Sequence, residues 1–352
     1  MTKTQKTYGR DIFFFMAFLL IGMLIMSVGA KSTIAKPIEL KIANFQPPLH
    51  KSNEMLKNWA QLIEKETGGK VRFILYPGST LAKARDTYNA TATGLADMCW
   101  TFAGYSRGRF HLSEVIILPL GLKSAEHGAR VLFDLYHKFP EIRAEYKDTH
   151  LLWLSPAPHR QIHSKEPVRR VEDFKGMKTR VPSSEAPHVK ALNGVPVTMP
   201  GPEVYLALER GVLDADFHPW EAAYSYKWYE IVRYHTKADL YLAGLFICTM
   251  NLDTWNKLPV DVQEVIREYS GKYGYVEVSS KGMWDKYESY YLEWLKKNTS
   301  NEVIYWSDEE KAKARALMKT PVVGKWLDDA EAKGLPGREI LSEAMKLIKL
   351  YE

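Results

Sequence analysis

The chain has 352 residues, a formal net charge of +6 at pH 7 and a charged fraction of 26%. This excess of positive charge is small and spread along the sequence, which argues against a nucleic-acid-binding protein. The length is sufficient for two α/β lobes of about 150 residues each.

Residues 1–30 have the pattern of a secretory signal peptide. Three basic residues precede the almost wholly apolar run 12–28, and Val28-Gly29-Ala30 supplies small residues for cleavage. An uncleaved membrane anchor is the alternative, because about 17 apolar residues reach the lower limit for crossing a bilayer. We expect cleavage and export to the periplasm, with the cleavage site left open.

After residue 37 the sequence alternates between strand and helix patterns. Strands are predicted at 40–43, 71–76 and 96–100, where apolar residues alternate or form short runs. Helical spacing predicts a helix from Ser52, as its N-cap, to Ile63, and a shorter helix over 86–93. This order is typical of an α/β lobe with a largely parallel sheet.

The alternation restarts in the second half of the chain, after helical patterns over 124–146. Strands are predicted at 151–154, 160–164, 178–182 and 195–199, with helices at 186–192 and 202–208. A long helical pattern then runs from Leu258 towards Lys297, and at about 1.5 Å per residue it could span both lobes. We therefore predict two lobes, chain crossovers between them and a cleft that closes about a hinge.

Cys99 and Cys248 are the two cysteines of the chain. One disulfide is possible in an oxidising compartment, but both residues lie in apolar, strand-like runs. Free buried thiols are therefore the favoured interpretation.

Catalytic and metal-binding motifs are mostly missing. The sequence has no nucleophile elbow, phosphate-binding loop, dinucleotide fingerprint, Cys-x-x-Cys or His-Glu-x-x-His. His159 and His163 stand four residues apart, but in a strand-like run, which argues against a metal site. Asp214 and Asp216 lack the further oxygen ligands of a calcium loop, so a turn capped by aspartates is favoured. With His218 they leave a secreted hydrolase open as a second class of function.

Arg180 is the best candidate for binding a ligand. It lies in the run Lys178-Thr179-Arg180-Val181-Pro182, a short strand ended by a proline. A guanidinium stays charged when desolvated and matches a carboxylate with two parallel hydrogen bonds. Together with Arg160 and His218, Arg180 suggests an anion site, although an ordinary surface cation is the alternative for Arg180 alone.

At these residues the chain resembles the extracytoplasmic solute-binding proteins of TRAP (tripartite ATP-independent periplasmic) transporters, DctP type. The likeness covers essentially the whole chain after the leader. Its motifs are TGGKV at 67–71, YPG at 76–78, TGLADM at 93–98, LPL at 118–120, DFKGMKTRVP at 173–182 and EVYLALERGVLD at 203–214.

The resemblance implies a type II-like, two-lobed periplasmic binding protein with a hinge, crossover strands and a long lobe-spanning helix. We expect one lobe over 37–157 plus about 244–285, and the other over 158–243 plus about 286–352. It also implies a function without catalysis or cofactor, in which a small organic acid is captured and handed to a membrane permease. A sensor module for a membrane receptor is a third possibility, and both monomers and homodimers fit the family.

The family's principal carboxylate clamp corresponds to Arg180, and a second arginine of some members corresponds to Arg160. His218 replaces the asparagine of sialic acid binders. Phe217 and His218 replace the Glu-Trp pair of metal-using 2-oxo acid binders, so no metal is expected. The remaining expected ligand contacts are Phe45, Gln46, Phe102, Tyr105, Phe217 and Trp220. These aromatic residues suggest a monocarboxylate with an apolar or aromatic body, although the rings could equally pack inside the lobes or touch each other across the closed cleft.

Overall fold

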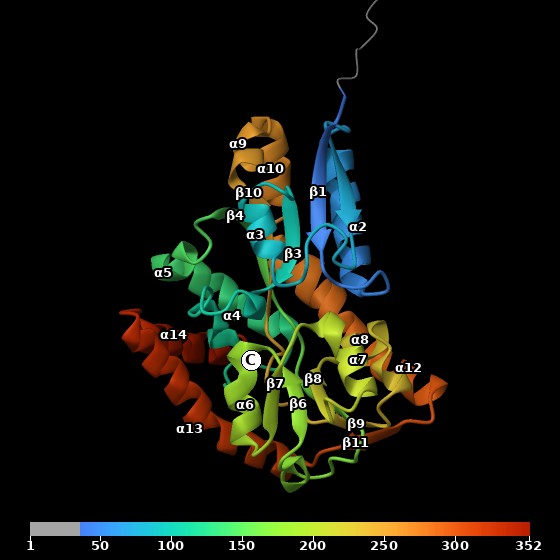
Figure 1. Ribbon diagram of the computed structural model, residues 1–352. Helices are drawn as coiled ribbons and strands as arrows, with labels where there is room; N and C mark the ends of the chain where they lie inside the picture. Colours follow the sequence, from blue (N-terminus) through green and yellow to red (C-terminus); the bar gives the residue numbers. More distant parts are fainter. Residues whose placement is uncertain (1–35) are drawn as a thin grey trace, which may run out of the picture. The chain divides into compact units, whose positions relative to one another are not determined.

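The computed structural model describes residues 36–352, and the predicted signal peptide of residues 1–30 lies outside them. Within the described part of the chain, no helix combines the length and apolarity needed to cross a membrane. The secondary structure is divided between two mixed sheets, each covered by helices (Figure 1).

The first sheet has the strand order β2-β1-β3-β10-β4. Strand β1 (Ile38–Asn44) runs parallel to β2 (Val71–Tyr76) and β3 (Met98–Phe102). Strand β10 (Leu245–Asn251) is antiparallel to both β3 and β4 (Thr149–Pro156). Strands β1, β2, β3 and β4 therefore run in one direction, as expected for a largely parallel sheet, and β10 runs against them because it enters the sheet from a distant part of the sequence.

Four helices follow the strands of this sheet in the first half of the chain: α2 (Lys51–Glu66), α3 (Thr87–Ala92), α4 (Ala125–Lys138) and α5 (Pro140–Ala144). Helix α2 buries Met55, Leu56 and Trp59 at the helical spacing that predicted it. Its N-cap is His50 rather than Ser52, because the His50 side chain accepts a hydrogen bond from the Ser52 backbone N–H. We call this sheet and its helices lobe I.

The second sheet has the order β11-β9-β5-β8-β6-β7 and is also mixed. Its strands are β5 (Gln161–Ser164), β6 (Lys178–Val181), β7 (Val195–Thr198), β8 (Ala215–His218), β9 (Tyr234–Lys237) and β11 (Glu302–Tyr305). Helices α6 (Ala186–Ala191), α7 (Val204–Glu209) and α8 (Trp220–Ser225) connect them. We call this sheet and its helices lobe II.

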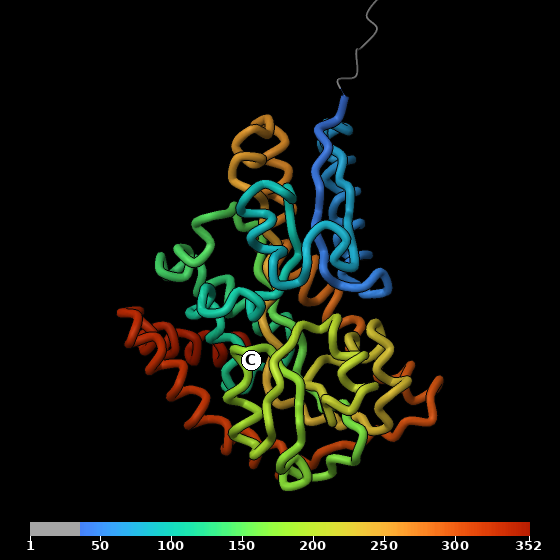
Figure 2. The backbone as a smooth tube through the Cα atoms, in the orientation of Figure 1, coloured from blue at the N-terminus to red at the C-terminus, as the bar shows by residue number. Residues whose placement is uncertain are grey.

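Two chain segments cross between the sheets and pair with each other (Figure 2). The Ala157 N–H donates to the Gly244 carbonyl at 2.9 Å, and the Arg160 N–H donates to the Tyr241 carbonyl at 2.8 Å. A paired, two-segment connection is the expected hinge of a two-lobed protein.

The expected long helix is present but interrupted. Helices α9 (Leu252–Lys257) and α10 (Val260–Glu268) come first, and after a break at Ser270 follow α11 (Gly271–Tyr273), a π-helix (Gly274–Asp285) and α12 (Lys286–Asn298). The π-helix contacts β4 and α2 of lobe I, whereas α12 contacts α8 of lobe II. The continuous run from 271 to 298 therefore spans both lobes.

The last two helices close the chain. Helix α13 (Asp308–Ala332) packs on α6 of lobe II, and α14 (Gly337–Leu350) packs on α4 of lobe I. The predicted division places 286–352 with lobe II, and these residue boundaries stay a prediction. Cys99 and Cys248 are both buried free thiols.

Candidate ligand-binding site

A cavity of about 30 Å³ lies between the lobes and is lined by residues of both. Lobe I and the lobe-spanning helix contribute mainly aromatic side chains, and lobe II contributes most of the polar ones. The principal lining residues are Phe45, Gln46, His50, Phe102, Tyr105, Phe246 and Trp284 on the first side, and Arg160, Arg180, Pro182, Gly201, His218 and Tyr226 on the second.

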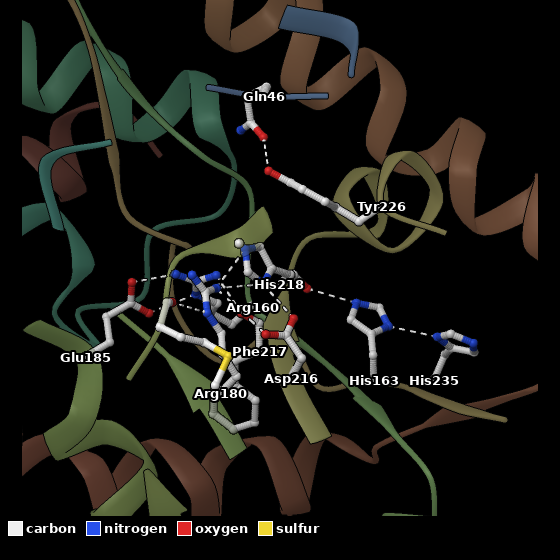
Figure 3. A network of polar contacts seen from close by, with 12 residues as sticks. Gln46, Arg160, His163, Arg180, Glu185, Asp216, Phe217, His218, Tyr226 and His235 are labelled. Atoms are coloured by element: carbon white, nitrogen blue, oxygen red, sulfur yellow. Dashed lines mark hydrogen bonds and ion pairs between the residues drawn. The ribbon is translucent and has the colours of Figure 1, made fainter. Parts of the chain in front are cut away.

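Arg180 lies on β6, where the parallel register places it beside Asp216 of β8. Its side chain is 1% exposed, and Nε donates to the Met199 carbonyl at 2.8 Å. Nη1 lies 2.9 Å from Nε2 of His218, and Figure 3 shows these two side chains facing each other. Among residues 36–352, Nη2 has only a long contact of 3.4 Å, to the Tyr105 hydroxyl. Nη2 is thus the nitrogen of Arg180 with the weakest protein contact.

His218 is held between Arg180 and Asp216. Its Nδ1 lies 2.5 Å from Asp216 Oδ2, so a protonated Nδ1 donates to the carboxylate. Nη1 of Arg180 lies 3.0 Å from Nδ1 and 2.9 Å from Nε2 of the same ring. Burial, and then the charge of Arg180, lower the pKa of His218 well below its usual value. The imidazole ring is therefore neutral.

Asp216 completes this group of charges. Burial raises the pKa of its carboxyl to about 6, although the nearby positive charge of Arg180 acts in the opposite direction. Within the described residues 36–352, its Oδ1 has no hydrogen-bond donor, and it lies 3.7 Å from Nη1 of Arg180. Asp216 therefore offsets part of the charge of Arg180 from behind the cavity.

Arg160 also lines the cavity, but its guanidinium is already paired. Nε and Nη2 donate to the two oxygens of Glu185 at 2.8 and 2.5 Å, and Nη1 donates to the Phe217 carbonyl at 2.6 Å (Figure 3). Glu185 is fully buried and also accepts from the Tyr241 hydroxyl at 3.0 Å. Sequence reasoning missed Glu185, because nothing local to the Ser183–Glu185 turn marks it as a partner of Arg160.

Two further polar contacts cross from lobe I to lobe II. The Tyr105 hydroxyl accepts from the Gly201 N–H at 2.8 Å, and the Tyr226 hydroxyl donates to Gln46 Oε1 at 2.5 Å. No hydrogen bond within residues 36–352 uses the proton of the Tyr105 hydroxyl. This proton is available to an acceptor in the cavity beside Nη2 of Arg180.

Aromatic rings form the wall opposite the arginines. Phe246 stands at the centre, 5.1 Å from Phe102, 5.2 Å from Trp284 and 6.3 Å from Phe45 between ring centroids. The Tyr105 ring packs on both Phe45 and Phe102. Sequence reasoning identified Phe45, Phe102 and Tyr105 but missed Phe246 and Trp284. Phe246 lies on β10, just after the hinge, and Trp284 lies on the lobe-spanning helix.

Phe217 and Trp220 do not lie on the cavity. Successive residues of a strand point to opposite faces, so Phe217 faces away from His218 and stacks on Phe174 at 5.1 Å. Trp220 packs edge-on against His163 at 5.4 Å. Both rings pack lobe II, which was the alternative interpretation of the aromatic residues.

The residues considered for metal binding or catalysis have separate contacts in the structure. His159 contacts the Leu122 carbonyl, whereas His163 contacts His235 and the His218 carbonyl. Asp214 accepts from the Lys178 N–H at 2.8 Å, as a turn-capping aspartate does. Residues 36–352 contain no group of three or more His, Cys, Asp or Glu side chains arranged to hold a metal ion.

Comparison with known proteins agrees with this architecture. The family described as "Bacterial extracellular solute-binding protein, family 7" (DctP) matches residues 42–327. A TRAP solute-binding protein from Rhodoferax ferrireducens, solved with benzoate, is 26% identical with a TM-score of 0.84, over 89% of this chain and 98% of that chain. A marine metagenome TRAP protein specific for aromatic acids, solved with 3-hydroxybenzoate, is 27% identical with a TM-score of 0.84, over 90% of this chain and 100% of that chain. The C4-dicarboxylate-binding periplasmic protein DctP of Rhodobacter capsulatus is 26% identical, over 69% of this chain and 74% of its own length.

Proposed function

Because the chain belongs to the DctP family of extracellular solute-binding proteins, whose members bind small organic acids, we propose that it captures a monocarboxylate with an aromatic body. One observation carries this proposal. Arg180 Nη2 and the Tyr105 hydroxyl lie 3.4 Å apart on the cavity, opposite a wall of aromatic rings. An ionised head and an apolar body would each find a matching surface there.

The carboxylate would accept hydrogen bonds from Arg180 Nη2 and from the Tyr105 hydroxyl. Hydrogen bonds to charged groups contribute about 1.5–3 kcal/mol each, and desolvation in a closed cleft strengthens them. Met199 and His218 hold the other two nitrogens of Arg180, so the guanidinium is oriented before a ligand arrives. Such orientation lowers the entropic cost of binding.

The body of the ligand would lie against Phe102 and Phe246. Aromatic rings pack favourably edge-to-face, and such pairs contribute about 0.5–1.5 kcal/mol beyond the burial of apolar area. The similar proteins solved with benzoate and 3-hydroxybenzoate support this assignment. A polyhydroxy acid would leave hydroxyl groups facing these rings without partners.

The cross-lobe contacts of Tyr105 and Tyr226 suggest how binding would be completed. A ligand held by Arg180 on lobe II would be covered by lobe I when the two contacts form. We propose that the closed protein delivers its ligand in the periplasm to a TRAP membrane permease. The ligand would be released unchanged: neither Asp214 nor Asp216 lines the cavity, and His218, which does, has its Nδ1 held by Asp216.

Calorimetry on the purified protein tests this function. We expect benzoate and 3-hydroxybenzoate to bind in the micromolar range, about 8 kcal/mol, and sialic acid not to bind. Arg180→Ala should lower the affinity at least 100-fold without unfolding the protein, whereas Arg210→Ala, an exposed arginine of lobe II, should have no effect. Tight binding of polyhydroxy acids with no response to aromatic acids would contradict the proposal. Mass spectrometry of the ligand after incubation would reveal any turnover.

A further inference from the structure

The cavity is lined by two arginines that differ in how closely a carboxylate holds them. Glu185 accepts hydrogen bonds from Arg160 with both of its oxygens, whereas Asp216 Oδ1 lies 3.7 Å from Nη1 of Arg180 and leaves Nη2 without a close partner among residues 36–352. Glu185 accepts hydrogen bonds from Nε and Nη2 of Arg160 in a bidentate ion pair, and the Phe217 carbonyl accepts a third hydrogen bond from Nη1. Three of the five N–H groups of Arg160 are therefore committed to the protein. The pair is sealed from water, since Arg160 is 1% exposed and Glu185 is fully buried.

The charge of Glu185 is fixed in position by a second donor. The Tyr241 hydroxyl, on the segment that crosses between the lobes, donates to the same Glu185 oxygen that accepts from Arg160 Nε. Glu185 is not a lining residue, so it acts on the cavity through Arg160. In a low-dielectric surrounding, a buried carboxylate at this distance cancels most of the field of the guanidinium.

We propose that Glu185 determines the charge of the acid that this site accepts. By neutralising Arg160, it leaves Arg180 as the single guanidinium able to compensate an anion, so the site selects singly charged acids over doubly charged ones. This inference rests on the proposed function, because it concerns the ligand of the same cavity. A second carboxylate on the ligand would be desolvated in the closed cleft without a cation of its own, which is costly.

The effect of ligand charge can be separated from that of ligand size with two acids that have nearly the same shape. Isophthalate carries two carboxylates on a benzene ring, and 3-carbamoylbenzoate replaces one of them by a neutral amide. We expect the wild-type protein to bind 3-carbamoylbenzoate at least 10-fold more tightly than isophthalate in calorimetry. Glu185→Gln, which removes one negative charge and frees Arg160, should shift this ratio at least 10-fold towards isophthalate.

A double variant provides the matched control. Arg160→Met combined with Glu185→Gln removes both charges of the pair, so the preference for the singly charged ligand should stay as in the wild type. Circular dichroism of each variant reports whether the fold is intact. Because the wild-type ratio is itself predicted, the proposal can be tested even where Glu185→Gln does not fold.

The possible outcomes separate this inference from the proposed function. Equal or tighter binding of isophthalate by the wild-type protein would overturn the charge selection while leaving carboxylate capture in place. If folded Glu185→Gln protein keeps the wild-type ratio of affinities for 3-carbamoylbenzoate and isophthalate, the charge selection by Glu185 is likewise overturned. Failure of the wild-type protein to bind benzoate, isophthalate or 3-carbamoylbenzoate would overturn the proposed function, and the charge selection with it.

Discussion

His50 Nε2 lies 2.7 Å from Glu221 Oε2, and this contact joins the start of helix α2 in lobe I to helix α8 in lobe II. The other oxygen of Glu221 accepts from the Lys51 N–H at 3.1 Å. The carboxylate thus caps a 16-residue helix of the opposite lobe, where the positive end of the helix dipole stabilises negative charge. Both His50 and Glu221 are buried at the edge of the candidate site.

Glu221→Gln should therefore weaken the closed arrangement without touching the ligand. A lower population of the closed state reduces the apparent affinity in proportion, and we expect a loss of about 3–10-fold. The loss should lie mainly in faster dissociation. Stopped-flow binding measures both rates, and Glu209→Gln, an exposed glutamate of lobe II, is the control. A wild-type dissociation rate in Glu221→Gln would show that this contact does not hold the lobes together.

Tyr105→Phe should weaken ligand binding more than Tyr226→Phe. Tyr226→Phe removes the hydrogen bond to Gln46, whereas Tyr105→Phe removes the one from the Gly201 N–H and the long contact with Nη2 of Arg180. Of the two hydroxyls, that of Tyr105 lies beside Arg180. A net hydrogen bond contributes about 0.5–1.5 kcal/mol, so the loss of a contact to the ligand should add a further 2–10-fold to the cost. Calorimetry with benzoate measures the difference. Equal losses in the two variants would argue against a carboxylate at Tyr105.

Affinity for a monocarboxylate should rise as the pH falls from 8 to 6. Burial raises the pKa of Asp216 to about 6, so above this pH the side chain is negative and repels an anion bound to Arg180. Near pH 6 a bound anion favours the protonated form of the Asp216 carboxyl, so binding of the ligand is accompanied by uptake of protons from solution. Calorimetry in two buffers of different ionisation enthalpy counts these protons. Asp216→Asn should flatten the pH profile, and a profile as steep as that of the wild type would assign the effect to another group.

Glu114→Gln should stabilise the protein at alkaline pH. Burial raises the pKa of Glu114 to about 8 in the folded protein, from 4.5 in the unfolded chain. The folded state therefore binds this proton more tightly, and its stability falls as the pH rises from 4.5 to 8. We expect the unfolding temperature of the wild type to fall more than that of Glu114→Gln between pH 6 and 9. Parallel curves for the two proteins would refute this assignment.

Several features of the site follow from local sequence. The run Lys178 to Pro182 predicts a short strand, and the structure places Arg180 on such a strand, beside the cavity. Strand alternation also carried a signal that was overlooked, since Phe217 and His218 are neighbours and must face opposite sides of β8. Trp220 was likewise expected on the cavity but packs on His163 inside lobe II.

The sequence by itself determined the alternation of strands and helices, the two lobes and the presence of an arginine suited to a carboxylate, because these depend on periodicity and on residue type. Tertiary structure alone decided which charges remain available. Glu185 neutralises Arg160 from 25 residues away, and Glu221 meets the backbone of Lys51 from 170 residues away. Such pairs form only when folding brings distant residues together and excludes water from them. A local sequence pattern cannot predict which distant residues will meet.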